Sequence, residues 1–370
     1  MCRSDGSHSM SMRWLFPALL LMWSLVGAAP SHAGEAQYLH VAMRSSVLTQ
    51  FWGQPVSVEA HVLLPDSFYK EPQKRYPIFY WIQGFGGDGQ IDLNNELSWQ
   101  RPMRRLHTEF IVVFLNGMFN DGHQEFADSA NNGPWGTALT TEFIPETEKR
   151  FRAMATAETR FVGGNSSGGW SALWLQVSYP NVFGGEWSLA PDPVDFRDFT
   201  GPDLTRVPPQ NFFKDDAGHA YRLDGEPLSD FVVGPSWKRH QFESFDAVFS
   251  PRGTDDKPEP LFNRQTGVID PTVARYWEQH YDIAAIMREN WHTLGLQLRH
   301  KLHIIVGTRD QFRLDGPVTL LQKELRGLGS DAEIDFAPGA NHFTVFDWNG
   351  GAIDYIIKEA ASPGAIEASP

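Results

Sequence analysis

The sequence predicts an α/β fold with a mostly parallel central sheet and helices on both faces. Apolar runs of strand length recur along the 370 residues, helical patterns lie between these runs, and the two kinds of segment alternate through most of the chain. Strands buried on both faces have continuous apolar runs, and alternation of strands with helices favours parallel pairing through right-handed crossovers.

The expected strands begin at 56–65, where VSVEAHVLLP alternates between apolar and polar residues, as a half-exposed strand does. The runs YPIFYWIQ and EFIVVFLNG, at 76–83 and 109–117, are continuously apolar and end near glycine. Four further strands are expected at 159–164, 183–190, 301–307 and 331–336.

The expected helices occupy intervals between or after these strands. Apolar residues recur at helical spacing in 137–152, 168–179, 317–329 and 351–361. We therefore expect one catalytic domain over residues 34–361, followed by a flexible tail at 362–370.

The segment 191–272 interrupts the alternation, and a helical pattern resumes only at 273–290. The segment is rich in Pro, Gly and Asp, and connections of this length in a compact domain are usually functional insertions. We expect a cap-like insertion across the carboxyl edge of the sheet, after the strand that follows the helix 168–179. Surface decoration remote from any site is the alternative.

The N-terminus has the features of a cleaved secretory signal peptide over residues 1–33. Arg13 precedes the apolar run 14–29, and small residues stand at Ser31 and Ala33. The run is shorter than the roughly 20 residues of a membrane span, although an uncleaved anchor is the alternative. The sequence therefore predicts a secreted or periplasmic protein without stable membrane insertion after cleavage.

Composition excludes several kinds of chemistry. The only cysteine, Cys2, would be removed with the signal peptide, so we expect no disulfide and no cysteine nucleophile. The net charge is −14 and no stretch concentrates Lys or Arg, which argues against nucleic acid as a partner. Acidic pairs lack the spacing of a calcium loop, and no H-E-x-x-H pattern occurs, so we expect no metal or cofactor.

The stretch TRFVGGNSSGGWSAL, at 159–173, contains the pattern G-x-S-x-G centred on Ser166. An expected strand leads directly into this pattern and an expected helix leads directly out of it. Such a sharp turn crowds the positions two before and two after the serine, where Gly164 and Gly168 stand. The sequence therefore predicts that Ser166 is a nucleophile, with a plain glycine-rich turn as the alternative.

A serine nucleophile needs a base and an acid, which follow it along the chain in the order acid, then histidine. Asp310 lies three residues after the glycine that closes the strand 301–307, and His342 lies between the last strand and the last helix. These positions predict His342 as the base and Asp310 as the acid. Other aspartates at strand ends stay open as the acid: Asp315, Asp192 and Asp195.

The oxyanion of an acyl-transfer intermediate needs two N–H donors. One is expected from Ser167, directly after the nucleophile, and the other from Phe85 in the glycine-rich loop after the strand 76–83. An ordinary glycine turn is the alternative for that loop. Candidate pocket residues are Gln83, Gly86, Trp135 and Trp170, with core packing as the alternative for the tryptophans.

Five stretches together resemble the putative esterase family of α/β-hydrolases, which includes esterase D-like and enterochelin-esterase-like enzymes. They are YPIFYWIQGFGGDG, NNGPWGTALTTEFIPETEKRF, GGNSSGGWSAL, VGTRDQF and GANHF. The resemblance implies an α/β-hydrolase fold with Ser166, Asp310 and His342 as the catalytic triad and the amides of Phe85 and Ser167 as the oxyanion hole. The family usually has His-Gly where this chain has Gln83-Gly84.

The predicted function is cofactor-free hydrolysis of carboxylic esters by an exported serine esterase through an acyl-enzyme intermediate. The expected substrate is a small-molecule or glycan-linked ester. A peptidase or acyltransferase on the same fold is one alternative. A binding protein that retains the fold without catalysis is the other.

Overall fold

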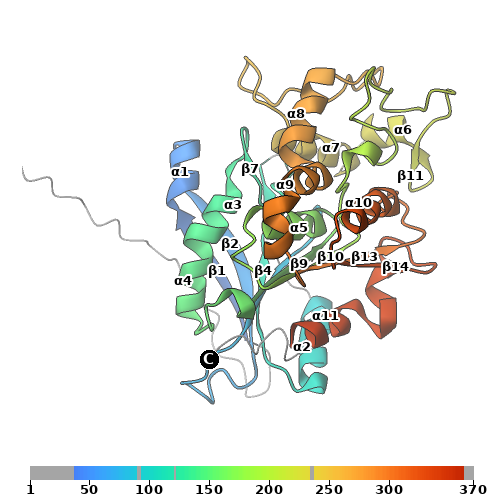
Figure 1. Cartoon of the computed structure of the whole chain (residues 1–370). Helices are drawn as coiled ribbons and strands as arrows, with labels where there is room; N and C mark the ends of the chain where they lie inside the picture. Colours follow the sequence, from blue (N-terminus) through green and yellow to red (C-terminus); the bar gives the residue numbers. More distant parts are fainter. Residues whose placement is uncertain (1–36, 90–92, 121, 234–236, 362–370) are drawn as a thin grey trace, which may run out of the picture.

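The computed structural model describes residues 37–89, 93–120, 122–233 and 237–361. The expected signal peptide and tail lie outside the described residues. In the described part of the chain, eight strands form one sheet in the order β1-β2-β4-β3-β9-β10-β13-β14 (Figure 1). Their bounds are β1 (Gln37–Ser45), β2 (Val56–Leu64), β3 (Ile78–Ile82), β4 (Ile111–Leu115), β9 (Arg160–Asn165), β10 (Gly185–Leu189), β13 (Leu302–Gly307) and β14 (Glu333–Ala337).

The sheet is parallel from β4 to β14 and antiparallel at the other end. The strand β2 pairs antiparallel with both β1 and β4, whereas all other neighbours in the sheet run parallel. All seven strands that the sequence predicted are present, and β1 was not predicted. The prediction of a mostly parallel sheet is confirmed, and the carboxyl ends of six parallel strands share one edge in the described structure.

The helices follow the predicted alternation with additions. Their bounds are α1 (Ser46–Trp52), α2 (Leu93–Leu106), α3 (Trp135–Ala138), η1 (Leu139–Phe143), α4 (Ile144–Arg150), α5 (Ser167–Ser178), α6 (Leu228–Val233), α7 (Trp237–Phe249), α8 (Pro271–Tyr281), α9 (Ile283–Gln297), α10 (Asp315–Gly327) and α11 (Ala352–Ala360). Short helical turns are η2 (Ala157–Thr159), η3 (Phe196–Asp198) and η4 (Thr344–Gly350). Three small hairpins complete the fold: β5 (Met118–Phe119) with β6 (Gly122–His123), β7 (Asp128–Ser129) with β8 (Gly133–Pro134), and β11 (Arg222–Leu223) with β12 (Glu226–Pro227).

Helices cover both faces of the sheet. On one face, α2 and α11 pack over an aromatic layer that includes Phe79, Trp81 and Phe114. Figure 1 shows these two helices together below the sheet, with α5, α9 and α10 on its other side. Burial of apolar surface on both faces explains why the parallel strands have unbroken apolar sequences. None of the described helices combines the length and apolar character needed to cross a bilayer.

The insertion packs onto the helices that cover the sheet. Phe249 of α7 contacts Trp170 of α5 with 4.9 Å between ring centroids, and Phe196 contacts the same phenylalanine from η3. Figure 1 shows α6, α7 and α8 grouped above α5 and α10. The segment predicted as irregular therefore contains the helices α6 and α7 and shares one apolar core with the sheet-covering helices.

The prediction of one helix over 273–290 is wrong in detail. Two helices, α8 and α9, meet at Asp282, whose side chain accepts a hydrogen bond from the N–H of Ala285 at 3.1 Å. An aspartate in extended backbone conformation that binds the first turn is an N-cap, and it begins a new helix. Apolar spacing on both sides of Asp282 concealed this break.

Candidate active site

Ser166 occupies a strained turn between β9 and α5. Its backbone φ of 56° and ψ of −125° are unusual for a residue with a side chain, and such strain concentrates at functional sites. Two backbone hydrogen bonds hold the turn. The N–H of Ser166 donates to the carbonyl of Leu189 in β10 at 2.9 Å, and the Ser166 carbonyl accepts from the N–H of Trp170 in α5 at 3.0 Å. The serine is thus fixed at the carboxyl end of β9.

Two glycines make this turn sterically feasible. A Cβ on Gly164 would lie 2.3 Å from the carbonyl oxygen of Gly168, and a Cβ on Gly168 would lie 2.1 Å from the carbonyl oxygen of Ile82. Gly84, in the loop after β3, is similarly tight, because its Cβ would lie 2.9 Å from the Cβ of Ser166. The turn and the loop after β3 therefore pack backbone against backbone beside the serine.

His342 and Asp310 form a buried pair. His342 lies on the loop after β14, Asp310 lies on the loop after β13, and the imidazole Nδ1 is 2.9 Å from the carboxylate Oδ2. Both residues are 7% exposed. The second carboxylate oxygen accepts from the N–H of Phe312 at 2.8 Å, and Gln311 Oε1 accepts from the His342 N–H at 3.0 Å. In a neutral imidazole held in this way, Nδ1 donates and Nε2 is left as the acceptor.

Ser166 and His342 both line one cavity of about 280 Å³. Its walls are mainly apolar, and three of its phenylalanines, Phe231, Phe242 and Phe245, come from α6 and α7 of the insertion. The remaining apolar walls are Leu223, Leu314, Phe85, Phe312, Phe343 and Phe346. The insertion therefore forms part of the cavity that contains the predicted nucleophile and base.

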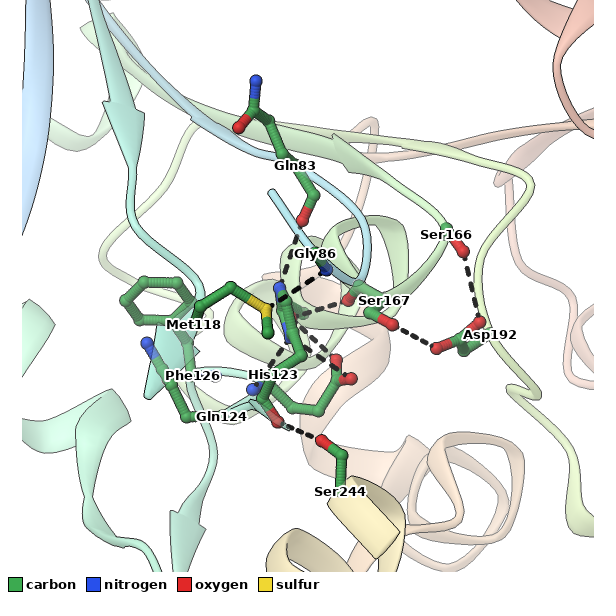
Figure 2. Close-up of polar contacts among 12 residues, drawn as sticks. Gln83, Gly86, Met118, His123, Gln124, Phe126, Ser166, Ser167, Asp192 and Ser244 are labelled. Carbon is green, nitrogen blue, oxygen red and sulfur yellow. Dashed lines mark hydrogen bonds and ion pairs between the residues drawn. The ribbon is translucent and has the colours of Figure 1, made fainter. Parts of the chain in front are cut away.

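The aspartates that the sequence left open as the acid have different partners. Asp192, on the loop after β10, accepts from the Ser167 hydroxyl at 2.6 Å and from the Ser166 hydroxyl at 3.4 Å (Figure 2). Asp195 forms an ion pair with an arginine, and Asp315 begins α10. Of Asp310, Asp192, Asp195 and Asp315, it is Asp310 whose carboxylate contacts the imidazole of His342 in the described structure.

The loop after β3 contains the second predicted oxyanion donor. The N–H of Gly86 donates to the sulfur of Met118 at 3.2 Å (Figure 2). The Gln83 side chain accepts from the N–H of Gly89 at 3.1 Å and so closes the loop on itself. Because the Gly86 N–H is engaged, Phe85 is the better donor candidate on this loop, together with Ser167 at the first turn of α5.

The candidate pocket residues of the sequence lie elsewhere. Trp135 is 3% exposed and its indole donates to the carbonyl of Asn132 at 3.0 Å, while Trp170 is 1% exposed and stacks on Trp174. Both tryptophans are core residues, so their prediction as pocket walls is wrong. Gln83 and Gly86 border a neighbouring cavity that shares Gly84, Phe85, Asn165 and Phe346 with the first.

Sequence reasoning missed a buried polar cluster beside the turn. His123, Glu125 and Asp192 are 0%, 1% and 4% exposed. Burial, with the nearby Glu125 carboxylate, raises the pKa of Asp192 to about 7. Burial lowers the pKa of His123, but contact with Glu125 outweighs it, so the pKa is raised. Two ionisable residues in the short run GHQEFA are the only signal in the sequence, and their spacing fits no known motif.

The strand order and the Ser166 turn after β9 define an α/β-hydrolase. The parallel strands end at one edge, where the described structure brings together the serine turn, the aspartate loop and the histidine loop. Within the described part of the chain, no group of three or more His, Cys, Asp or Glu residues is arranged to hold a metal ion.

The chain belongs to the family described as "Putative esterase", whose model matches residues 49–293. The protein is accordingly an esterase, and the resemblance noted from the sequence is confirmed. No functionally curated protein matches the chain in sequence.

Solved structures share the fold at low sequence identity. A ferulic acid esterase has 15% identity and a TM-score of 0.54, with 88% of this chain and 99% of that chain covered. The fluorophosphonate-binding serine hydrolase F of Staphylococcus aureus has 12% identity and a TM-score of 0.53, covering 89% and 100%. An S-formylglutathione hydrolase from Agrobacterium tumefaciens has 12% identity and a TM-score of 0.53, covering 91% and 98%.

Proposed function

We propose that this esterase is an exported serine hydrolase that cleaves carboxylic esters with Ser166 as nucleophile, His342 as base and Asp310 as the acid that orients it. The observation that carries the proposal is the pairing of His342 with Asp310 at 2.9 Å in the wall of the cavity that Ser166 also lines. The backbone N–H groups of Phe85 and Ser167 are the proposed oxyanion donors.

The reaction follows from these roles. His342 Nε2 takes the Ser166 proton as the serine oxygen attacks the ester carbonyl carbon, and the negative charge on the carbonyl oxygen is stabilised by the two backbone donors. The protonated imidazole then gives its proton to the departing alcohol, which leaves an acyl-enzyme. Water, deprotonated by His342, attacks this intermediate and releases the acid and the free serine. Asp310 stabilises the imidazolium in both steps.

The Ser166 side chain must rotate before attack. In the resting arrangement its hydroxyl is directed to Asp192, at a long 3.4 Å (Figure 2). A hydrogen bond of this length is weak, so little free energy opposes a change of rotamer toward His342. Catalytic hydrogen bonds commonly tighten only when substrate binds.

The cavity suggests the acyl group. Its phenylalanine and leucine walls favour an apolar or aromatic acyl chain of modest size, because these side chains offer dispersion and ring contacts and few polar partners. The name of one similar structure, ferulic acid esterase, is consistent with this choice. The alcohol portion is a small molecule or a glycan.

Covalent labelling tests the assignment directly. A fluorophosphonate probe should modify Ser166 in the folded protein and should not modify the Ser166→Ala variant, with the labelled residue located by peptide mass spectrometry. A panel of aryl esters, matched amides and acyl acceptors then separates an esterase from a peptidase or an acyltransferase. A folded protein that takes no label and turns over no ester is a binding protein, which contradicts the proposal.

Export has its own test. We propose that residues 1–33 are removed during secretion, and N-terminal sequencing of protein recovered from the cell exterior or periplasm should give Gly34 as the first residue. Recovery of a membrane-bound protein that keeps the apolar run 14–29 would contradict cleavage.

A further inference from the structure

A second carboxyl group lies directly against the nucleophile. Asp192 holds the Ser167 hydroxyl at 2.6 Å through one oxygen and the Ser166 hydroxyl at 3.4 Å through the other (Figure 2). Its backbone N–H also donates to the Ser166 carbonyl at 3.2 Å. The mechanism above uses neither oxygen, although Asp192 is 4% exposed and lines the substrate cavity.

The same carboxyl group belongs to a buried network that runs under the turn. The Ser167 carbonyl accepts from the Ser171 hydroxyl at 2.7 Å, and that hydroxyl lies 2.9 Å from Glu125 Oε2. Glu125 Oε1 is 3.2 Å from His123 Nδ1. The network therefore joins the residue after the nucleophile to a buried imidazole.

The other end of the network lies at the loop after β3, which contains the proposed oxyanion donor Phe85. His123 Nε2 lies 3.1 Å from the carbonyl oxygen of Gln83, which directly precedes the loop that begins at Gly84 (Figure 2). The network thus contacts the backbone just before each proposed oxyanion donor. His123 contacts the carbonyl of Gln83, two residues before Phe85, and the Asp192 N–H donates to the carbonyl of Ser166, directly before Ser167.

The two imidazoles near Asp192 are each paired with another carboxyl group. The imidazole of His123 is in contact with Glu125, so a protonated imidazole is balanced by that carboxylate. The imidazole of His342, which also faces Asp192 across the cavity, is paired with Asp310. Among the described residues, the side chains that hydrogen-bond the Asp192 carboxyl group are two hydroxyl groups. A buried carboxyl group with such partners favours its neutral form.

We propose that Asp192 is a positioning residue that must be neutral for Ser166 to react. An ionised Asp192 would accept the Ser166 proton in a charge-assisted hydrogen bond, which would hold the hydroxyl away from His342. It would also place a second negative charge close to Ser167, whose N–H is a proposed donor to the oxyanion. The neutral acid accepts only a weaker hydrogen bond from Ser166 and carries no charge. This inference rests on the proposed function, because it takes Ser166 as the nucleophile.

The proposal predicts an alkaline limit to activity set by Asp192. Ionisation of Asp192 removes the reactive form and so gives the alkaline limb of the activity profile. The groups that face Asp192 are Glu125, His123 and His342. Because burial and Glu125 raise its pKa to about 7, the reaction rate should decline above that pH.

The test measures fluorophosphonate labelling of Ser166 as a function of pH from about 5 to about 10. In the wild type, the labelling rate should decline at alkaline pH, by up to roughly tenfold per pH unit. The Asp192→Asn variant, whose side chain cannot ionise, should lack this alkaline decline. At pH 6 its rate should lie within about tenfold of the wild type.

For a second variant, we expect the alkaline limb of the pH profile to shift and not to disappear. The Ser167 hydroxyl stabilises the ionised carboxylate, so Ser167→Ala should raise the pKa of Asp192 and move the alkaline limb to higher pH while the backbone N–H stays in place. The control is Asp198→Asn, which removes a half-buried carboxyl group at the end of η3, where it lies beside Gly316. Its pH profile should have the wild-type shape.

The outcomes separate this inference from the proposed function. If the wild type labels at Ser166 but Asp192→Asn has the same alkaline limb, or only a uniform loss at every pH, the positioning role is wrong and the hydrolase assignment survives. If Asp192→Asn fails to fold, an unshifted limb in Ser167→Ala overturns the role instead. Absence of labelling in the folded wild type overturns the proposed function itself.

Discussion

Asp310 and Asp192 are both buried carboxyl groups near Ser166, and they differ in the group that each one contacts. Asp310 contacts the imidazole of His342, which lines the cavity with the serine. Asp192 contacts the serine hydroxyl without an intermediary. A carboxylate that acts through an imidazole promotes proton removal, whereas one that binds the hydroxyl directly competes with the base. In the proposed mechanism, the acid of the triad is therefore identified by its contact with the imidazole and not by its proximity to the nucleophile.

The largest expected effect concerns the Ser166 hydroxyl, which contacts Asp192 directly and which the proposed mechanism links to Asp310 through His342. Ser166→Ala should lower kcat by roughly 10⁴-fold or more, because no other group forms the acyl-enzyme. Its circular dichroism spectrum and melting temperature should match the wild type. Undiminished ester hydrolysis by this variant would leave both carboxyl groups without the proposed roles.

The next effect separates the two carboxyl groups. Asp310→Asn should lower kcat by about 10³- to 10⁴-fold, because an amide favours the wrong imidazole tautomer and cannot stabilise the imidazolium. Asp192→Asn, assayed at pH 6, should be far more active. Steady-state hydrolysis of an aryl ester by both variants provides the measurement. Equal losses of kcat in the two variants would contradict the assignment of Asp310 as the carboxylate that acts through His342.

The sequence was sufficient for seven of the eight strands of the described sheet, because these strands follow from local patterns, whereas β1 was not predicted. Unbroken apolar runs mark parallel strands, and glycines at fixed spacing mark the turn at Ser166. It was insufficient for α2, whose sequence LNNELSWQRPMRRL contains few apolar residues and an internal Pro102. Proline inside a helical pattern normally ends or kinks a helix, so no helix was predicted here although its polar and apolar residues are segregated.

The polar cluster was beyond sequence reasoning for a different reason. His123, Glu125 and Asp192 lie on two loops far apart along the chain, and their contacts depend on tertiary packing. Asp192 entered the sequence analysis only as an alternative acid. The burial of Trp135 and Trp170 was equally hidden, since a tryptophan in an amphipathic setting can face a core or a cavity.

A smaller effect tests the rigidity of the turn that presents Ser166 to both carboxyl groups. Gly168→Ala should destabilise the fold by roughly 2–4 kcal/mol, because its Cβ would clash with backbone at Ile82. The matched control is Gly327→Ala in α10, where no atom lies within 4 Å of the added Cβ. This control should be neutral or stabilising by up to about 1 kcal/mol. Thermal unfolding of both variants measures the difference, and similar melting temperatures would contradict the steric argument.

The last effect depends on pH and concerns another buried carboxyl group, Glu186 on β10. Burial raises its pKa to about 8, from an unfolded value near 4.5. The folded state therefore binds the proton more tightly, so this group's contribution to stability is full below pH 4.5 and is lost as the pH rises toward 8. Glu186→Gln should remove that loss, which amounts to at most about 1.4 kcal/mol per pH unit.

Urea unfolding at pH 5.5 and pH 8 measures this effect. The stability of Glu186→Gln relative to the wild type should increase with pH, and Asp192→Asn should show the same sign over a lower pH range. A constant difference between Glu186→Gln and the wild type at both pH values would show that Glu186 does not titrate in this interval.

The close packing of Gly84, Gly164 and Gly168 means that two parts of the cavity wall respond differently to substitution. Beside Ser166, an added methyl group at any of these three glycines would lie 2.9 Å or less from another atom. In the insertion, Phe231, Phe242 and Phe245 reach the cavity with their side chains and also pack in the apolar core. A change of cavity shape is therefore better engineered at these rings, with compensating changes in the core, than at the glycines around Ser166.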